Sequence, residues 1–334
     1  MRRKFSDWRF CYASTVPKRA PSPPDIVGSL LDWYARHKRT LPWRDLPHED
    51  LDHKAYLVLV SEVMLQQTQV SRVIILYKKF IQEFPTIRAL AKATNAQILI
   101  AWRGLGYNSR ALRLRDAAKT VVEEFDGAIP RTLEGLMAIK GIGHYTAAAI
   151  LNFAFSQAEP CLDTNIRRIV HRVFDGPETP EGEWPVSDKA LLPKDEALVA
   201  AMPKKRAAEL PAILMDFGSA VCTKRSPDCQ ACPLKEICRS AFKVPTPVQG
   251  VRQAKILKEP GRIIGGKFTP NRLVRGRIVE ALRDHPKGLA TSALGPYAAS
   301  DWNPVEHLSW LEEILEKLIR DDVIVQVAKV YRLH

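Results

Sequence analysis

The sequence predicts an all-α fold that ends in a small α+β module. Between Tyr56 and Phe155 one helical pattern follows another with short turns between them, and strand-like alternation is absent. Four cysteines lie within the seventeen residues from Cys222 to Cys238, which indicates a compact metal-binding loop. Residues 269–334 then show helical patterns followed by a predicted terminal β-hairpin.

The 334 residues, 46% of them hydrophobic, are enough for two or three domains. The net charge of +13 favours a polyanionic partner, and the alternative is a charge that only serves solubility. No uncharged apolar run is long enough to span a bilayer, so we expect no membrane association. Residues 1–24 are basic and rich in proline but lack the apolar core of a secretory signal. We interpret them as a flexible basic arm, and we expect a cytoplasmic, nucleoid-associated location if the source is prokaryotic.

The elements are expected in the following order. A helix over Asp25–His37 is followed by a basic turn, and further turns are expected at residues 85–86, 93–95, 104–106 and 126–127. Residues 175–203 are rich in Pro, Glu and Gly and predict a partly irregular excursion, followed by a helix over Ala207–Ser219. Residues 244–267 predict a linker. The last segment predicts helices over Asn271–Arg283, with Leu273, Ile278, Val279 and Leu282 inward, and over Leu308–Arg320, and strands over residues 323–325 and 327–333.

The stretch from Ser61 to Val70 organises the rest of the prediction. We read it as the opening of an amphipathic helix, because Val60, Val63 and Met64 fall on one face. Glu62 lies on another face, with an amide one turn further along. A carboxyl group beside apolar neighbours is a candidate general acid, because burial raises its pKa. The alternative is an exposed glutamate on a solvated helix.

The four clustered cysteines have the unequal spacing 6-2-5. Zinc also accepts four thiolates, but this spacing is not the paired pattern of four-cysteine zinc sites. A 4Fe-4S cluster fits better, and zinc remains the alternative. Basic residues flank the loop and indicate phosphate contact, so we expect a structural cluster. Cys11 and Cys161 are interpreted as plain thiols; the expected ligands are Cys222, Cys229, Cys232 and Cys238.

Two further motifs suggest phosphate binding and a second carboxylate. Within Ile139–Thr146, Gly141 and Gly143 allow a tight turn that exposes backbone N–H groups at a helix start, where phosphate binds well. An ordinary helix–helix turn is the alternative. Further on, Asp163 is expected to cap a helix that carries Arg167 and Arg168. Capping is compatible with a catalytic role.

Together these motifs resemble the helix-hairpin-helix DNA glycosylases with an iron–sulfur cluster, which include endonuclease III. Ser61–Val70 resembles the signature of the MutY-type adenine glycosylases, and Leu41-Pro42-Trp43-Arg44 fits the same branch. The resemblance covers about residues 25 to 240, in order and with matching intervals. The remaining part is similar to the short, non-Nudix tail of some actinobacterial-type members.

The resemblance implies a helix-hairpin-helix DNA glycosylase fold, with Glu62 facing Asp163 across a cleft between two domains. The implied division is an iron–sulfur cluster domain (25–54 and 150–240), a six-helix barrel domain with the helix-hairpin-helix (55–149), a basic linker (241–268) and a winged-helix-like module (269–334).

The family's activity is DNA base-excision repair. The enzyme flips adenine, mispaired with 8-oxoguanine or guanine, out of the duplex. Protonated Glu62 would donate to the base and then activate water, while ionised Asp163 would stabilise the oxocarbenium-like sugar. The implied set comprises the catalytic residues Glu62, Asp163, Tyr145, Asn165 and Arg44, and the DNA- and lesion-binding residues Leu65, Gln66, Gln67, Thr68, Tyr107, Lys140, Gly141, Gly143 and His144.

Tyr145 occupies the position where bifunctional relatives have a lysine that forms a Schiff base with the opened sugar. A tyrosine cannot do this, so the resemblance implies a monofunctional glycosylase. Lys140 is assigned to phosphate and not to lyase chemistry. The expected partner is double-stranded DNA with a mismatched or damaged pair, bound by a monomer.

The sequence departs from the family pattern in two places. Asn108 stands where many MutY-type enzymes have a second tyrosine, and we expect no Nudix-like domain in the C-terminal hundred residues, which are too short and wrongly patterned for one. The winged-helix-like module either substitutes for that domain or grips DNA, since Arg252 to Arg277 contains eight Lys or Arg against one Glu.

Three alternative functions stay open. The first is a mismatch thymine/uracil glycosylase, which Gln66 and Gln67 disfavour because those relatives tend to have arginines there. The second is a hypoxanthine glycosylase. The third is a non-catalytic DNA-binding protein, which the presence of both Glu62 and Asp163 disfavours.

Overall fold

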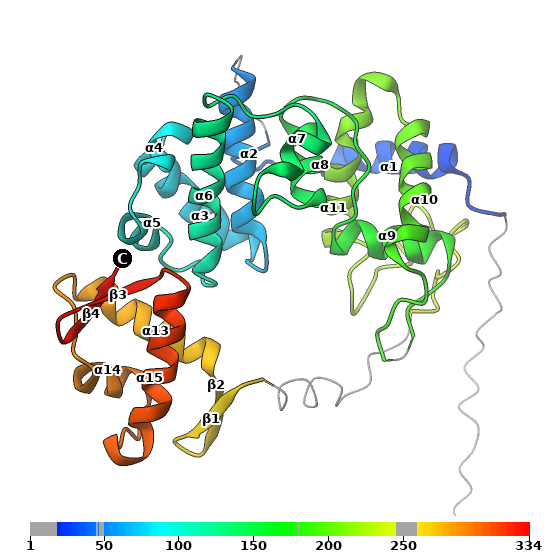
Figure 1. The fold of residues 1–334 in the computed structure, drawn as a ribbon. Helices are drawn as coiled ribbons and strands as arrows, with labels where there is room; N and C mark the ends of the chain where they lie inside the picture. Colours follow the sequence, from blue (N-terminus) through cyan, green and yellow to red (C-terminus); the bar gives the residue numbers. More distant parts are fainter. Residues whose placement is uncertain (1–18, 45, 47–49, 180, 245–258) are drawn as a thin grey trace, which may run out of the picture. The chain divides into compact units, whose positions relative to one another are not determined.

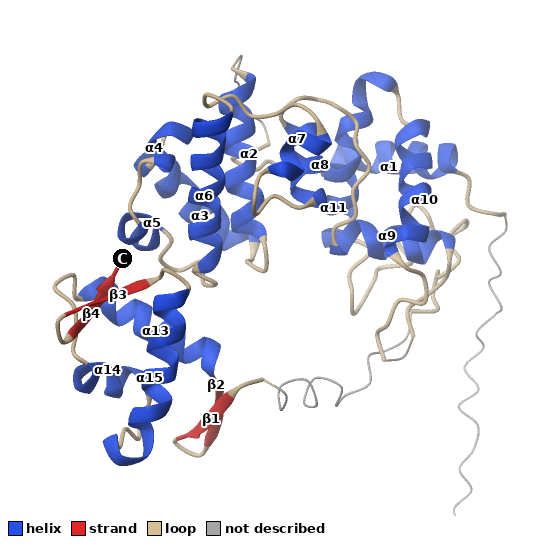
Figure 2. Cartoon of the chain, in the orientation of Figure 1, coloured by secondary structure: helices blue, strands red, loops and turns tan. Residues whose placement is uncertain are grey.

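The computed structural model describes residues 19–44, 46, 50–179, 181–244 and 259–334 (Figure 1). This part of the chain is mostly helical, with two short two-stranded antiparallel sheets (Figure 2). The predicted all-α fold with a small α+β end is thereby confirmed. Residues 1–18 of the expected arm and residues 245–258 of the expected linker lie outside the described residues.

The chain divides into two compact units. One unit combines Met1–Arg39 with Ala158–Val248, and the other combines Thr40–Gln157 with Gln249–His334. The first contains α1 (Pro23–His37), α9 (Thr164–Phe174), α10 (Asp188–Ala201), the 3-10 helix η1 (Lys204–Glu209) and α11 (Leu210–Ala220).

In the first unit α1 packs against α10 and α11, and α11 packs against α9. The Trp33 and Phe217 rings meet edge to face, with centroids 5.3 Å apart. The turn after α1 is fixed by Arg39, whose backbone N–H and Nε donate to the buried Asp216 carboxylate at 3.0 and 2.6 Å. The predicted helix over Asp25–His37 is confirmed and begins at Pro23, where proline fits the first helical turn.

The expected excursion over 175–203 is irregular only in part, as predicted, because α10 begins at Asp188 and takes up its second half. Pro193 lies inside this helix. Packing of Leu191 and Leu198, both buried, against the rest of the unit outweighs the missing backbone N–H.

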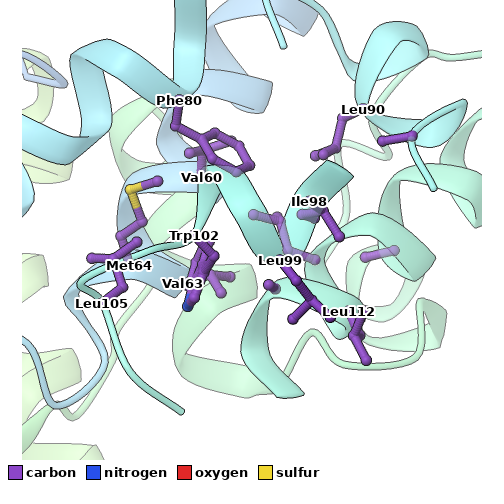
Figure 3. Packing of buried hydrophobic residues seen from close by; sticks show 14 of the residues in the cluster. Val60, Val63, Met64, Phe80, Leu90, Ile98, Leu99, Trp102, Leu105 and Leu112 are labelled. Carbon is purple, nitrogen blue, oxygen red and sulfur yellow. The ribbon is translucent and has the colours of Figure 1, made fainter. Parts of the chain in front are cut away.

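The second unit begins with seven helices: α2 (Leu51–Leu65), α3 (Val70–Glu83), α4 (Ile87–Ala91), α5 (Asn95–Ala101), α6 (Ser109–Glu124), α7 (Leu133–Ala138) and α8 (His144–Phe153). Thr86, Thr94 and Thr132 cap α4, α5 and α7 by accepting from backbone N–H groups. Figure 3 shows part of the shared core, in which Val60 and Phe80 come from different helices. The expected turns lie where the sequence predicts them.

We predicted that Ser61–Val70 opens an amphipathic helix. This prediction is wrong, because the stretch begins in the last turns of a buried helix, α2. Helix α2 starts after its cap, Asp50, and stops at Leu65, so Gln66 lies beyond it. Every α2 residue from Ala55 to Met64 is buried. Such a helix lacks the polar face that helical periodicity requires, and this is why its limits were misread.

The second unit ends in β1 (Gly261–Ile264), β2 (Lys267–Pro270), α13 (Asn271–Asp284), α14 (Thr291–Ala298), α15 (Pro304–Arg320), β3 (Ile324–Val327) and β4 (Val330–Leu333). We refer to residues 259–334 as the C-terminal module. Three helices followed by the β3–β4 hairpin match the winged-helix-like expectation, including its terminal strands.

The β1–β2 hairpin corrects the linker prediction. Residues 261–268 are strand and turn rather than linker, because Gly265 and Gly266 both adopt positive φ (54° and 74°), as two-residue hairpin turns require. Helix α14 was not predicted. On α13 the inward residue is Val274 and not Leu273, which is 45% exposed.

The division into units differs from the expected domain limits around residues 40–54. Leu41 and Trp43 belong to the same apolar core as α2 and α3, and the Trp43 ring meets Tyr77 at 5.4 Å. The segment that carries Leu41 and Trp43 therefore belongs with helices α2 and α3 of the second unit. The C-terminal module also belongs to this unit, and the β3–β4 hairpin lies next to α5 (Figure 1).

Candidate active site

The structure brings Glu62 and Tyr145 together. Glu62 lies in the last turn of α2 and is only 4% exposed. Tyr145 lies in the first turn of α8, which packs against α2, and its hydroxyl donates to Glu62 Oε2 at 2.8 Å. A buried carboxyl group with one hydroxyl donor and apolar neighbours is chemically suited to proton transfer.

The glycine turn between α7 and α8 is formed as predicted. Gly141 has a φ of +97°, which favours glycine, and Gly143 occupies the cap position of α8. Glycine at the cap position offers no side chain to cap this described helix, and Lys140 in the preceding turn is exposed. His144, the first α8 residue, is half-buried. Backbone N–H groups in this arrangement can bind phosphate.

The predicted lesion-contacting residues occupy two loops of the same unit. Leu65, the last residue of α2, and Thr68 are half-buried, while Gln66 and Gln67 are exposed, with Gln67 in the left-handed region (φ 57°). We call Gly104–Asn108 the recognition loop; its Tyr107 is 52% exposed. Exposed amide and aromatic groups on adjacent loops are suited to contacts with DNA bases.

One buried arginine, Arg110 on α6, joins these two loops. Its guanidinium donates to the Leu105 and Gly106 carbonyls at 2.8 and 3.1 Å, and to the Thr68 hydroxyl at 3.1 Å. It also donates to the last carbonyls of α2, including Val63 at 2.9 Å. Burial lowers the pKa of Arg110 to about 10. One guanidinium therefore fixes the end of α2 relative to the recognition loop.

Arg110 was not among the residues predicted from the sequence. The available signal was an arginine beside the apolar positions Ala111 and Leu114 of a predicted helix. Its guanidinium carbon also lies 5.6 Å from the Tyr107 ring centroid. Arg44, another predicted site residue, lies half-buried in the turn after Leu41, to whose carbonyl its N–H donates at 3.0 Å.

In the other unit, Asp163 caps α9 as predicted. Its Oδ1 accepts from the N–H groups of Asn165 and Ile166 at 2.8 and 2.6 Å. Its Oδ2 accepts from the Asn165 side-chain amide at 2.9 Å. The half-buried carboxylate is thus held in one orientation by three local donors.

Asn165 connects this carboxylate to the cysteine loop, residues 222–238. Arg168 donates to Asn165 Oδ1 at 2.9 Å and to the Cys222 carbonyl at 2.7 Å. Arg172 approaches Cys222 Sγ at 3.5 Å and donates to the Thr223 carbonyl at 2.7 Å. Burial lowers the pKa of Arg168, with the Cys222 thiol acting in the opposite direction.

Asp195 on α10 was also not identified from the sequence. Its Oδ2 accepts from the Cys161 N–H at 2.9 Å, and it is only 2% exposed. Burial raises the pKa of Asp195 to about 7. Through this hydrogen bond the Asp195 carboxyl group holds the backbone segment that leads from Cys161 to Asp163.

The four predicted ligands Cys222, Cys229, Cys232 and Cys238 are half-buried and unpaired as disulfides. Among the described residues, no group of three or more His, Cys, Asp or Glu side chains is arranged to hold a metal ion. The donor chemistry nevertheless fits a thiolate-bound cluster. Burial, together with the neighbouring thiols, raises the pKa of Cys232 and of Cys238 to about 12. The nearby Arg172 offers positive charge to thiolates.

The described helices include none that is both long and apolar enough to cross a bilayer.

Residues 60–183 match the family model described as HhH-GPD superfamily base excision DNA repair protein. The chain is 35% identical over 301 residues to an adenine DNA glycosylase of Mycolicibacterium smegmatis, covering 90% of this chain and 92% of the relative. It therefore belongs to the HhH-GPD superfamily of DNA glycosylases, within its MutY-type branch. An adenine DNA glycosylase of Homo sapiens is 40% identical over 226 residues, but they cover only 39% of that protein and 65% of this chain.

Solved structures agree on the fold. A thermostable thymine-DNA glycosylase matches with a TM-score of 0.58 and 26% identity, over 66% of this chain and 97% of that one. A trapped endonuclease III–DNA covalent intermediate with an estranged adenine matches with a TM-score of 0.54 and 20% identity, over 67% and 98%. These matches support the predicted helix-hairpin-helix glycosylase fold.

Proposed function

We propose that this DNA glycosylase hydrolyses the N-glycosidic bond of adenine mispaired with 8-oxoguanine or guanine in duplex DNA. The observation that carries the proposal is the buried Glu62, held by the Tyr145 hydroxyl at the end of α2. The relatives at 35–40% identity, all named adenine DNA glycosylase, support adenine as the target. We propose that it acts as a monomer, in the cytoplasm if the source is prokaryotic.

The proposed reaction starts with flipping of adenine, because its glycosidic bond is not accessible inside the base stack. Protonated Glu62 donates a proton to a ring nitrogen, which makes the base a better leaving group. The C–N bond breaks with its electron pair going to the base, and positive charge develops on the sugar. Asp163 stabilises that charge, and Glu62, now a carboxylate, takes a proton from the attacking water.

The environments of the two carboxyl groups support these roles. Glu62 is buried at the end of α2 among the apolar residues of that helix, and its carboxyl group accepts from the Tyr145 hydroxyl. The donors from Asn165 and Ile166 fix Asp163 in one orientation. Asn165 is proposed to hold Asp163, and Arg44 to orient Glu62 and its surroundings.

We assign the DNA contacts to loops of the second unit. The N–H groups after Gly141 and Gly143, with Lys140 and His144, would hold one phosphate. Leu65, Gln66, Gln67, Thr68 and Tyr107 would wedge and stack at the step from which adenine is removed.

The activity is proposed to be monofunctional. Strand cleavage by a lyase requires an amine that forms a Schiff base with the opened sugar. Tyr145 offers a phenol at that position instead. The product is then an intact strand with an abasic site, which breaks only when alkali is added.

The experiment that tests this proposal is single-turnover cleavage on a panel of duplexes, read with and without alkali. The panel contains adenine opposite 8-oxoguanine, guanine or cytosine, and thymine, uracil and hypoxanthine opposite guanine or thymine. Alkali-dependent breaks at adenine opposite 8-oxoguanine or guanine are expected. A preference for thymine or uracil would instead support a second candidate function, that of a mismatch thymine/uracil glycosylase. The 26% identity to a thymine-DNA glycosylase is the observation in its favour.

The cysteine loop is proposed to hold a 4Fe-4S cluster through Cys222, Cys229, Cys232 and Cys238. When bound, this group would act as a structural cross-link of the loop. We predict that Cys232→Ser loses most of the iron, the sulfide and the brown colour, and binds DNA more weakly. Cys161→Ala, which changes a buried cysteine outside the loop, should keep all of them. A native protein that is colourless and still binds DNA fully would refute the cluster.

A further inference from the structure

Asn108 is used in an unusual way. It stands at the cap position of α6, where an asparagine side chain normally accepts from the N–H groups of the first turn. Here its backbone is helical (φ −53°, ψ −27°) and its side chain makes no cap bond. Instead, Asn108 Oδ1 accepts from Arg283 Nη2 of the C-terminal module at 3.0 Å.

Arg283 lies on α13 and is fully engaged within the protein. Its side chain is 3% exposed, its Nε donates to the Leu99 carbonyl at 2.9 Å, and its Nη1 pairs with Glu280. The guanidinium therefore joins the end of α5, the recognition loop and α13. It is not available for a DNA phosphate.

Further hydrogen bonds join the C-terminal module to residues at both ends of α5. Arg103, which directly precedes the recognition loop, donates to Glu280 at 2.9 Å and to both oxygens of Asp284 at 2.8 Å. At the other end of α5, the buried Asn95 donates to the Asp322 carbonyl at 2.7 Å and to its carboxylate at 2.8 Å. The C-terminal module thus contacts α5 at both ends.

The charge of the C-terminal module argues against DNA gripping as its main role. Residues 259–334 contain eleven Lys or Arg and ten Asp or Glu, while the whole chain has a net charge of +13. Arg272 and Arg275, which the sequence analysis assigned to phosphate, pair with Glu259 and Asp321. A module with balanced charge and paired arginines gains little from phosphate contacts.

The recognition loop needs support. Gly104, Gly106 and Tyr107 all have positive φ (89°, 69° and 46°), and this conformation is unfavourable for the tyrosine. Arg110 holds the loop from the barrel side through the Leu105 and Gly106 carbonyls. Asn108 is where the C-terminal module holds it.

We propose that the C-terminal module is a brace for the recognition loop, in which Arg283 positions Tyr107 through Asn108. The inference rests on the proposed function in one respect, namely that Tyr107 stacks on DNA beside the target base. Arg283 is a positioning residue that does not contact DNA. Bracing is a different role from either of the two that the sequence had left open, which were substitution for a Nudix-like domain and gripping of DNA.

The test compares Arg283→Gln and Asn108→Ala with a matched control, Arg320→Gln, which makes the same change at an exposed position of the C-terminal module. The first measurement is hydrogen exchange of the amides of residues 104–110 in the DNA-free protein. If the module is a brace, these amides exchange faster in both test variants than in the wild type, and their exchange in the control is unchanged. Asn108→Ala removes only one side-chain acceptor, so it remains informative if Arg283→Gln does not fold.

The second measurement is the single-turnover excision rate with enzyme in excess. Loss of the charge-assisted hydrogen bond to Asn108 should slow excision by about tenfold in Asn108→Ala, and by at least as much in Arg283→Gln, which also loses its bonds to Leu99 and Glu280. In a Tyr107→Ala background the same change should have no further effect, because Arg283 acts through Tyr107. The dependence of DNA affinity on salt should stay that of the wild type.

Three results would overturn the brace: unchanged exchange in the loop, effects of Arg283→Gln and Tyr107→Ala that add, or a salt slope reduced by about one, which marks a lost phosphate contact. Wild-type protein that excises no base from any duplex would refute the proposed function. The exchange experiment does not depend on excision, so the two failures are distinguishable.

Discussion

The two carboxyl groups of the candidate site are held in opposite ways. Glu62 depends on partners distant in sequence, because the surrounding core buries it and Tyr145 of another helix donates to it. Asp163 is half-buried and is held by the first residues of its own helix. Packing defines the environment of Glu62, the proposed acid, whereas local backbone geometry defines the environment of Asp163. Substitutions should therefore affect the two sites differently.

The largest expected effect is that of Glu62→Gln. Glutamine has the same shape and can still accept from Tyr145, but it cannot transfer the proton. Excision of adenine opposite 8-oxoguanine should fall by about 10⁴-fold in single turnover, the upper end for general acid–base catalysis. DNA affinity should stay within about twofold of the wild type, since no phosphate contact is changed. Near-normal excision by this variant would disprove the assigned mechanism.

Asp163→Asn should have the second largest effect. Asparagine caps a helix as well as aspartate does, so the folding stability should stay the same while the negative charge is lost. Excision should slow by about 10²–10³-fold, as on removal of one electrostatic stabiliser. Asp163→Ala is the matched variant and should in addition lose about 1 kcal/mol of unfolding free energy in denaturant titrations. Equal stability of the two variants would contradict the capping role.

Tyr145→Phe should have the smallest effect of the three. It removes the hydroxyl that donates to Glu62 Oε2 and leaves the ring in place. Losing one hydrogen bond of this kind should slow excision by about tenfold, with melting temperature and DNA affinity unchanged. A loss as large as that of Glu62→Gln would mean that the phenol takes part directly in the reaction.

Local features were predictable from the sequence. The cap at Asp163 and the glycine turn at Gly141 follow from backbone rules that act within a few residues, and the structure has both where they were expected. The hairpin turn at Gly265–Gly266 obeys the same kind of rule, yet its composition was read as a linker. Its strands of four residues are too short to show a clear alternation.

The limits of α2 could not be predicted from hydrophobic periodicity, because a helix that is buried on every side has no separate apolar face. The roles of Arg110, Asp195 and Arg283 were also beyond the sequence. Each binds groups that lie far from it along the chain, and nothing in its neighbours announces those partners.

Short-range backbone and side-chain preferences encode the helical class, the glycine turn, the Asp163 cap and the set of candidate residues, so these could be predicted from the chain alone. The contact of Tyr145 with Glu62, the joining of two loops by Arg110 and the contact of the C-terminal module with Asn108 could not be predicted in this way. They arise because burial and hydrogen bonding between distant segments depend on how helices pack. That packing is a property of the whole core and not of any stretch of sequence.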